Sequence, residues 1–151
     1  CDLRGSCLAA GILVGAVLHK VDCANATWAM VNLSDADLRR TNFSNADLRG
    51  ASMKRAKLNG ACLRGANGGE LGGIGAGNRS IATSFEGAVL VGADLGSAVL
   101  KGANCRGADF SRCNLARVDL TDADLTDAIF EQATLEGATF TGACLDDTLG
   151  L

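Results

Sequence analysis

The sequence from Ala88 to Leu145 repeats every five residues: AVLVG ADLGS AVLKG ANCRG ADFSR CNLAR VDLTD ADLTD AIFEQ ATLEG ATFTG ACL. From Phe85 to Leu145, 13 central positions spaced five apart are all Leu or Phe except Cys105, and Ala lies two residues before ten of them. A fixed period of this kind predicts a repeat architecture, so it decides how the rest of the chain is interpreted.

A period of five fits neither regular secondary structure. In a helix the apolar pair would rotate by about 140° at each repeat, and in a strand an odd repeat would alternate between the two faces. Gly recurs two residues after the centre (Gly87, Gly92, Gly102), where a long helix would lose stability each time. The pattern therefore predicts a chain that turns a corner at every repeat and buries its apolar pairs by stacking coils.

The unit A-(D/N)-L-x-x, seen at residues 93–95 and 123–125 and with Phe at the centre at 108–110, resembles that of the pentapeptide-repeat proteins. The resemblance implies an all-β solenoid, a right-handed quadrilateral β-helix with four repeats per coil and one long inserted loop. Its narrow interior would hold the Ala and Leu/Phe side chains.

The register of the centres divides the chain into segments. A first pentapeptide array is expected at 1–65, a Gly-rich inserted loop at 66–84, a second array at 85–147, and the start of a C-terminal tail or cap at 148–151. The insert is either a linker between two half-solenoids or a loop that projects from one continuous column. The loop is favoured, because Leu71, Ile74 and Ile81 could anchor it against a coil.

Composition excludes several classes of protein. The one apolar run, Leu8–Leu18, is too short to span a bilayer, so no membrane insertion is expected. Seven Cys without CxxC spacing argue against a disulfide framework or a zinc site and favour a reducing compartment such as the cytoplasm. Residue Cys1 already lies in register, so the chain is expected to be part of a larger chain or assembly.

Charge is distributed unevenly along the sequence. Residues 1–65 hold nine Lys and Arg against five acids, a net charge of +4, whereas residues 66–151 hold five against twelve, a net charge of −7. With four repeats per coil, positions 20 apart stack. The expected basic face is either a solvated surface or a docking surface for an anionic partner. It comprises His19 and Lys20 beneath Arg39 and Arg40, with Lys54 and Arg55 on the neighbouring sides.

The last coils are acidic. Asp124 and Asp127 are expected to stack under Asp146 and Asp147, which would give either a solvated acidic end or a site for a divalent cation. Surface acids at this spacing are more often solvated, so no metal site is predicted.

Little in the sequence supports catalysis. The chain has one His, and a core filled by Ala, Leu and Phe leaves no cavity for a small-molecule substrate or a cofactor. The sequence therefore predicts a non-enzymatic scaffold, a protein–protein interaction module within a larger complex. The contact elements would be the basic face, the acidic end and the insert residues Glu70, Leu71 and Arg79. Aromatic residues are only 4% of the chain, which argues against nucleic acid as the partner.

The resemblance implies two alternatives. Some pentapeptide-repeat proteins resemble duplex DNA and protect a type II topoisomerase (gyrase) from inhibitors, and an inserted loop suits those members. The confinement of the acids to one end speaks against this role, because duplex DNA carries its charge along its whole length. Other members suggest an assembly role in an organelle lumen of the thylakoid type.

Overall fold

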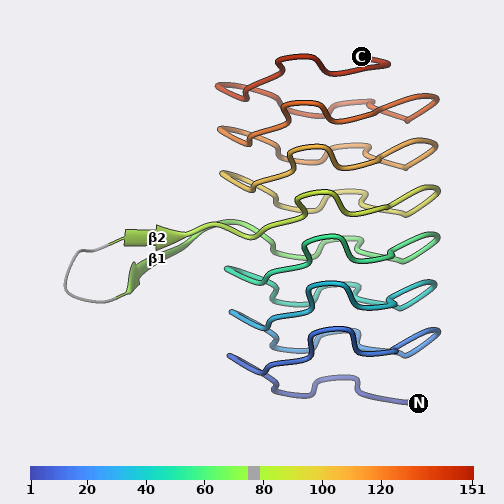
Figure 1. The fold of residues 1–151 in the computed structure, drawn as a ribbon, viewed down its shortest axis with the longest axis vertical. Coiled ribbons are helices and arrows are strands. Elements are labelled where there is room, and N and C mark those ends of the chain that lie inside the picture. Colours follow the sequence, from blue (N-terminus) through green and yellow to red (C-terminus); the bar gives the residue numbers. More distant parts are fainter. Residues whose placement is uncertain (75–78) are drawn as a thin grey trace.

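The computed structural model describes residues 1–74 and 79–151, and the side chains of residues 73, 74 and 79 also lie outside the described part. Figure 1 shows a column of stacked coils from which a two-stranded hairpin projects sideways. Within the described residues, no helix has the length and apolar character needed to cross a membrane.

Each coil comprises four repeats. Parallel bridges join Asp2 to Asp22, Asp22 to Asn42 and Asn42 to Cys62, and bridges with the same spacing continue along the column on both sides of the insert. Each bridge is one residue long because the chain turns after every fifth residue. The coil has four sides, and the column is a right-handed quadrilateral β-helix. The predicted all-β solenoid with four repeats per coil is confirmed.

The repeat at residues 93–97 shows why the unit has the form A-(D/N)-L-x-x. Ala93 and Leu95 point into the column and are buried. Asp94 lies on the flat side, where its Oδ1 accepts a hydrogen bond at 3.0 Å from the amide of Gly96. An Asn side chain accepts the same bond elsewhere, which explains why Asp and Asn alternate at this position.

The last two residues of the unit form the corner. The amide of Ala98 donates to the carbonyl of Leu95 at 2.9 Å and closes the turn. Ser97, just before it, has a φ of 57°, and non-Gly residues take this left-handed conformation at 15 corners of the described chain. Because it costs an L-residue about 1–2 kcal/mol, Gly, Asn and Asp are frequent here.

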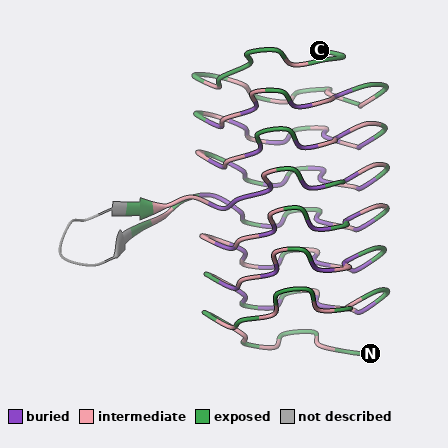
Figure 2. Ribbon diagram, in the orientation of Figure 1, coloured by how far each residue is buried: buried purple, intermediate pink, exposed green. Residues whose placement is uncertain are grey.

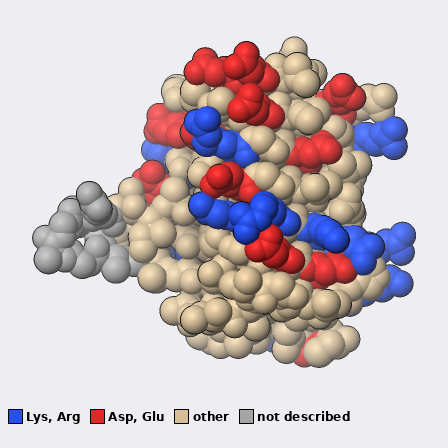
Figure 3. Space-filling model, viewed as in Figure 1, with Lys and Arg blue, Asp and Glu red and all other residues tan. Residues whose placement is uncertain are grey.

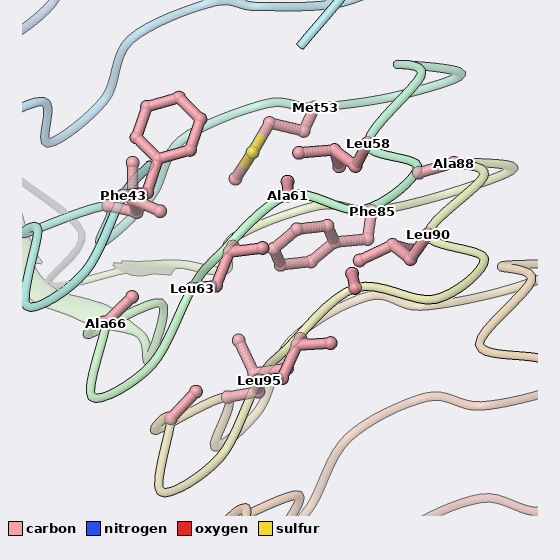
Figure 4. Packing of buried hydrophobic residues seen from close by; sticks show 14 of the residues in the cluster. Phe43, Met53, Leu58, Ala61, Leu63, Ala66, Phe85, Ala88, Leu90 and Leu95 are labelled. Atoms are coloured by element: carbon pink, nitrogen blue, oxygen red, sulfur yellow. The ribbon is translucent and has the colours of Figure 1, made fainter. Parts of the chain in front are cut away.

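The core is a continuous stack of one small and one large side chain per repeat. Figure 2 shows burial along the inside of the middle coils, and Figure 4 shows Met53, Leu58, Phe85 and Leu90 from successive coils in contact within it. The few inward polar groups are hydrogen-bonded; for example, the indole N–H of Trp28 donates to the hydroxyl of Ser6 at 3.0 Å.

The column continues through the break in register. Asp47 bridges Asn67, but Ser52 bridges Ser84 where the regular spacing would give Gly72, so the insert lengthens this coil. Asn67 still bridges Val99, and the amide of Gly68 donates to the carbonyl of Val99 at 2.7 Å. The segment that leaves the column is therefore 69–82, shorter than the expected 66–84. Gly68 occupies a central position without a large side chain, which hides the repeat in the sequence.

The insert forms the projecting hairpin. Strand β1 (Leu71–Ile74) pairs antiparallel with β2 (Arg79–Ile81), with Leu71 opposite Ile81 and Ile74 opposite Arg79. A Cβ placed on Gly50 would lie 3.5 Å from Cβ of Leu71 and 3.3 Å from Cγ2 of Ile81. The base of the hairpin thus packs closely on the column at a corner that has no side chain of its own.

Thr83 completes the hydrogen bonding where the hairpin leaves. At an uninterrupted corner the amide donates to the next coil, as Arg55 does to the carbonyl of Glu86 at 2.8 Å. The amide of Gly50 instead donates to Oγ1 of Thr83 at 2.9 Å, and this buried hydroxyl donates to the carbonyl of Leu48 at 3.0 Å. The hydroxyl is why Thr replaces the usual Ala.

The final residues do not leave the column as expected for a tail or cap at 148–151. Leu149 bridges Ile129, and its carbonyl accepts a hydrogen bond at 2.7 Å from the amide of Phe130. Thr148 and Gly150 take the small and central positions of one more repeat. Neither matches the apolar pair of the pattern, which is why the sequence did not reveal it.

The first coil presents apolar side chains outward. Ile12, Val14 and Val17 are 82%, 53% and 74% exposed, whereas polar residues fill most equivalent positions in later coils.

Candidate partner-binding surfaces

The outward residues lie on four flat sides and four corners, and three of these corners are named after a residue that each contains. The His19 corner contains the pairs 19–20, 39–40, 59–60, 91–92, 111–112 and 131–132. The Lys54 corner contains 14–15, 34–35, 54–55, 86–87, 106–107, 126–127 and 146–147. The Arg64 corner contains 4–5, 24–25, 44–45, 64–65, 96–97, 116–117 and 136–137.

The structure brings the four predicted basic residues of the His19 corner together. His19, Lys20, Arg39 and Arg40 are all exposed, and the amide of Lys20 donates to the carbonyl of Arg39 at 3.0 Å. Arg39 is paired with Asp37 at 2.6 Å, and its hydrogen bonds hold the pKa of that carboxyl far below the usual range.

Lys20 and Arg40 have no carboxylate within 4.0 Å among the described residues. Two uncompensated cations therefore lie one coil apart on this corner.

Lys54 and Arg55 are in a different electrostatic state. Lys54 pairs with Glu86 at 2.9 Å, in the coil above, and Arg55 pairs with Asp35 at 2.8 Å, in the coil below. The Arg55 hydrogen bond lowers the pKa of Asp35, and the Lys54 bond lowers that of Glu86. The expected basic face is thus split between two corners, and the Lys54 corner has its charge compensated.

The acidic residues lie at the C-terminal end of the same Lys54 corner. The amide of Asp127 donates to the carbonyl of Asp146 at 2.9 Å, and Asp146 and Asp147 are exposed. Asp124 lies under Cys144 instead of under Asp146, because stacked positions differ by four whole repeats and Asp124 occupies the flat side.

Asp124 also pairs with Arg106 at 3.2 Å. In the described chain no three His, Cys, Asp or Glu side chains gather closely enough to hold a metal ion. Figure 3 shows carboxylates gathered toward the C-terminal end of the visible face, with Lys and Arg over the middle coils.

Two of the three predicted insert contacts also support the hairpin. Leu71 packs over Gly50, as described above. A Cβ on Gly102 would lie 2.5 Å from Oε1 of Glu70, so the Glu70 side chain lies against the column at that glycine. Arg79 belongs to β2, and its side chain lies outside the described residues.

The thiols and the single imidazole do not form a reactive centre in the described chain. Burial raises the pKa of Cys23 to about 11 and the pKa values of Cys105 and Cys113 to about 12, so these interior thiols stay protonated at neutral pH. His19, the one imidazole, is exposed on its corner.

A polar groove on the Arg64 corner was not predicted from the sequence. Its two hollows, about 180 and 290 Å³, share Arg64, Gly96 and Ser97. The sequence feature that could indicate this groove is a set of small residues that stack beside Arg64 and Arg117. It could be read only after the true length of the insert was known, because the groove combines residues from both sides of it.

Comparisons with known proteins agree with the architecture. The family model for pentapeptide repeats (8 copies) matches residues 32–67, 81–115 and 113–149. A trypsin-treated variant of QnrB1, a plasmid-mediated fluoroquinolone resistance protein, superposes with a TM-score of 0.77 at 18% identity, covering 97% of this chain and 70% of that one. Full-length QnrB1 gives a TM-score of 0.74 at 18% identity, covering 99% and 73%.

A further solved structure is HetL, from the cyanobacterium Nostoc sp. strain PCC 7120, a pentapeptide repeat protein involved in heterocyst differentiation regulation. It is 29% identical over 97% of this chain and 77% of its own, with a TM-score of 0.48. No curated protein matches the sequence.

Proposed function

Because the chain belongs to the pentapeptide-repeat family, we propose that it is a non-catalytic interaction module that docks a partner protein on its outer corners. The column is held by hydrogen bonds between every pair of neighbouring coils, and its interior is filled by side chains. Such a body offers fixed spacings of about 4.8 Å from coil to coil, which suits a rigid docking surface.

The observation that carries this proposal is the contrast between two corners. Lys20 and Arg40 are exposed and have no carboxylate within 4.0 Å in the described chain, whereas Lys54 and Arg55 are neutralised by ion pairs. Uncompensated like charges one coil apart repel each other, and an acidic partner would relieve that repulsion. The His19 corner is therefore the proposed docking surface, and its partner is a protein with an acidic patch.

Capture of partners from an extract of the source organism tests this proposal. The variant pair Lys20→Gln and Arg40→Gln removes two free cations, and the control pair Lys54→Gln and Arg55→Gln removes the same charge from ion pairs. Loss of the main captured protein with the first pair alone is expected. Equal capture by both variants and the unmodified chain would contradict docking at this corner.

A second candidate function is mimicry of DNA toward a type II topoisomerase. The projecting hairpin and the acidic C-terminal coils favour it, and the likeness in fold to QnrB1 makes it worth testing. The net charge of +4 on residues 1–65 opposes it. A gyrase supercoiling assay with a fluoroquinolone distinguishes the two: protection would support mimicry, and absence of both protection and binding would remove it.

A further inference from the structure

The groove on the Arg64 corner is the concave feature that the docking role above does not use. One hollow is lined by Arg64, Gly96, Ser97, Asn114, Ala116, Arg117 and Glu136, and the other by Ser44, Asn45, Arg64, Gly65, Gly96 and Ser97. The two hollows meet at Arg64, so together they form one groove that crosses successive coils along the corner.

The groove is hollow because the corner residues at its base are small. Longer side chains from neighbouring coils extend over these small residues. A Cβ on Gly96 would lie 3.3 Å from Nη1 of Arg64, and a Cβ on Gly65 would lie 2.5 Å from Oδ1 of Asn45. The Arg64 and Asn45 side chains therefore run along the corner over these glycines. Their polar ends lie beside the open space.

Hydrogen-bond donors predominate in the groove. Arg64 has one long contact, 3.4 Å, with Asp94, and Arg117 has no carboxylate within 4.0 Å in the described chain. Ser97 is exposed on the corner between the two arginines. Glu136 lines the far end of the groove beside Arg117. An acidic group is therefore attracted to the part of the groove between Arg64 and Arg117 and repelled by Glu136 beyond Arg117.

We propose that this groove binds an extended acidic segment of a partner protein, with its carboxylates on Arg64 and Arg117. The planar guanidinium group binds carboxylates through paired hydrogen bonds. The two arginines are two coils apart, about 10 Å, and an extended peptide advances about 3.3 Å per residue. Acidic residues three positions apart in the partner therefore match the spacing. The groove is also longer than a single bound anion requires, and the Ser97 hydroxyl and the Asn45 side-chain amide suit a peptide main chain.

This inference rests on the proposed docking role but uses a different corner, so the two can fail separately. Fluorescence anisotropy with a labelled peptide, Ser-Glu-Gly-Ser-Glu-Ser, measures binding to the full chain, and the same peptide with both Glu replaced by Gln is the control ligand. We expect the Glu peptide to bind about tenfold more tightly than the Gln peptide, as charge-assisted hydrogen bonds predict.

Three variants locate the binding. Arg64→Gln with Arg117→Gln is expected to abolish the tenfold preference, and Arg112→Gln, which removes an exposed arginine from the His19 corner, is expected to retain it. Ala116→Phe fills the groove without changing charge and is expected to weaken binding about tenfold. Melting curves that match the unmodified chain verify that each variant is folded.

Several outcomes would overturn the inference. Undiminished binding by Ala116→Phe would show that the peptide is attracted by surface charge and does not occupy the groove. Equal loss of the preference for the Glu peptide in the Arg112 and Arg64/Arg117 variants would also show attraction by surface charge alone. Competition by inorganic phosphate as effective as that by the unlabelled Glu peptide would show a small-anion site instead. A negative peptide assay beside positive capture through Lys20 and Arg40 would refute the groove alone.

Discussion

Thr83→Val is the substitution whose effect follows most closely from the structure. It keeps the volume of a fully buried side chain but removes a hydroxyl that accepts from the amide of Gly50 at 2.9 Å and donates to the carbonyl of Leu48 at 3.0 Å. Each such bond contributes about 0.5–1.5 kcal/mol, and an unsatisfied donor costs about 1–3 kcal/mol. We expect a loss of about 2 kcal/mol in the free energy of unfolding, or about 4–8 °C in Tm for a chain of this length.

Thr41→Val is the matched control. Thr41 is also fully buried, but its hydroxyl makes one bond, at 2.7 Å to the carbonyl of Leu18, and that carbonyl also accepts from the amide of Val21. Its loss should cost about 0.5 kcal/mol. Thermal melting compares the variants, and hydrogen exchange at the Gly50 amide should accelerate only in Thr83→Val. Equal melting temperatures with an unchanged Gly50 exchange rate would refute the role assigned to the hydroxyl.

Other substitutions test the repeat positions and the ion pairs. Leu115→Asp should prevent folding, because it loses about 1.5–3 kcal/mol of apolar burial and adds an unpaired buried charge. Arg112→Asp should change the free energy of unfolding by less than about 0.5 kcal/mol. Similar thermal melting of the two variants would contradict the inward position of residue 115. Gln132→Gly should raise the free energy of unfolding by roughly 0.5–1 kcal/mol, because residue 132 has a φ of 59°, which glycine adopts without strain. The neighbouring substitution Glu131→Gly should lower the free energy of unfolding, and urea titration measures both. The guanidinium of Arg49 hydrogen-bonds the Asp47 carboxylate at 2.7 Å and lowers its pKa, so the stabilisation is present above the unfolded value near 3.8 and is lost as pH falls through the folded value. Asp47→Asn should therefore flatten the decline of the urea midpoint between about pH 5 and 2, and an unchanged slope would contradict the role of this pair.

The fold could be predicted because its determinants lie within each five-residue unit. The small residue, the Asp or Asn that accepts the turn amide, the apolar centre and the corner residue are all present in residues 93–97. The length of the insert could not be obtained in the same way. Gly68 occupies a central position without a large side chain, so the last repeat before the insert is hidden in the sequence. Thr83 occupies a small position, and its hydrogen bonds at the hairpin junction follow only from the structure.

The candidate surfaces were only partly readable from the sequence. Stacking of four repeats per coil correctly placed Lys20 beside Arg40, but it gave no measure of which cations are paired. Arg55 pairs with Asp35 across one coil, and Lys54 pairs with Glu86 across the insert. The second pair depends on the long step from Ser52 to Ser84, which the sequence alone did not define.

Deleting the hairpin tests the claim that one column runs through the whole chain. Removal of residues 71–82 restores the regular spacing between bridged positions and leaves Gly69 and Glu70 as the two corner residues; removal of 69–82 takes these two as well. We predict that the first deletion retains the β-sheet circular dichroism spectrum and melts within about 5 °C of the full chain, a cost of about 1 kcal/mol. The second should melt far lower, because a repeat without its corner cannot close. Equal melting of the two deletions, or unfolding of the first, would contradict a continuous column.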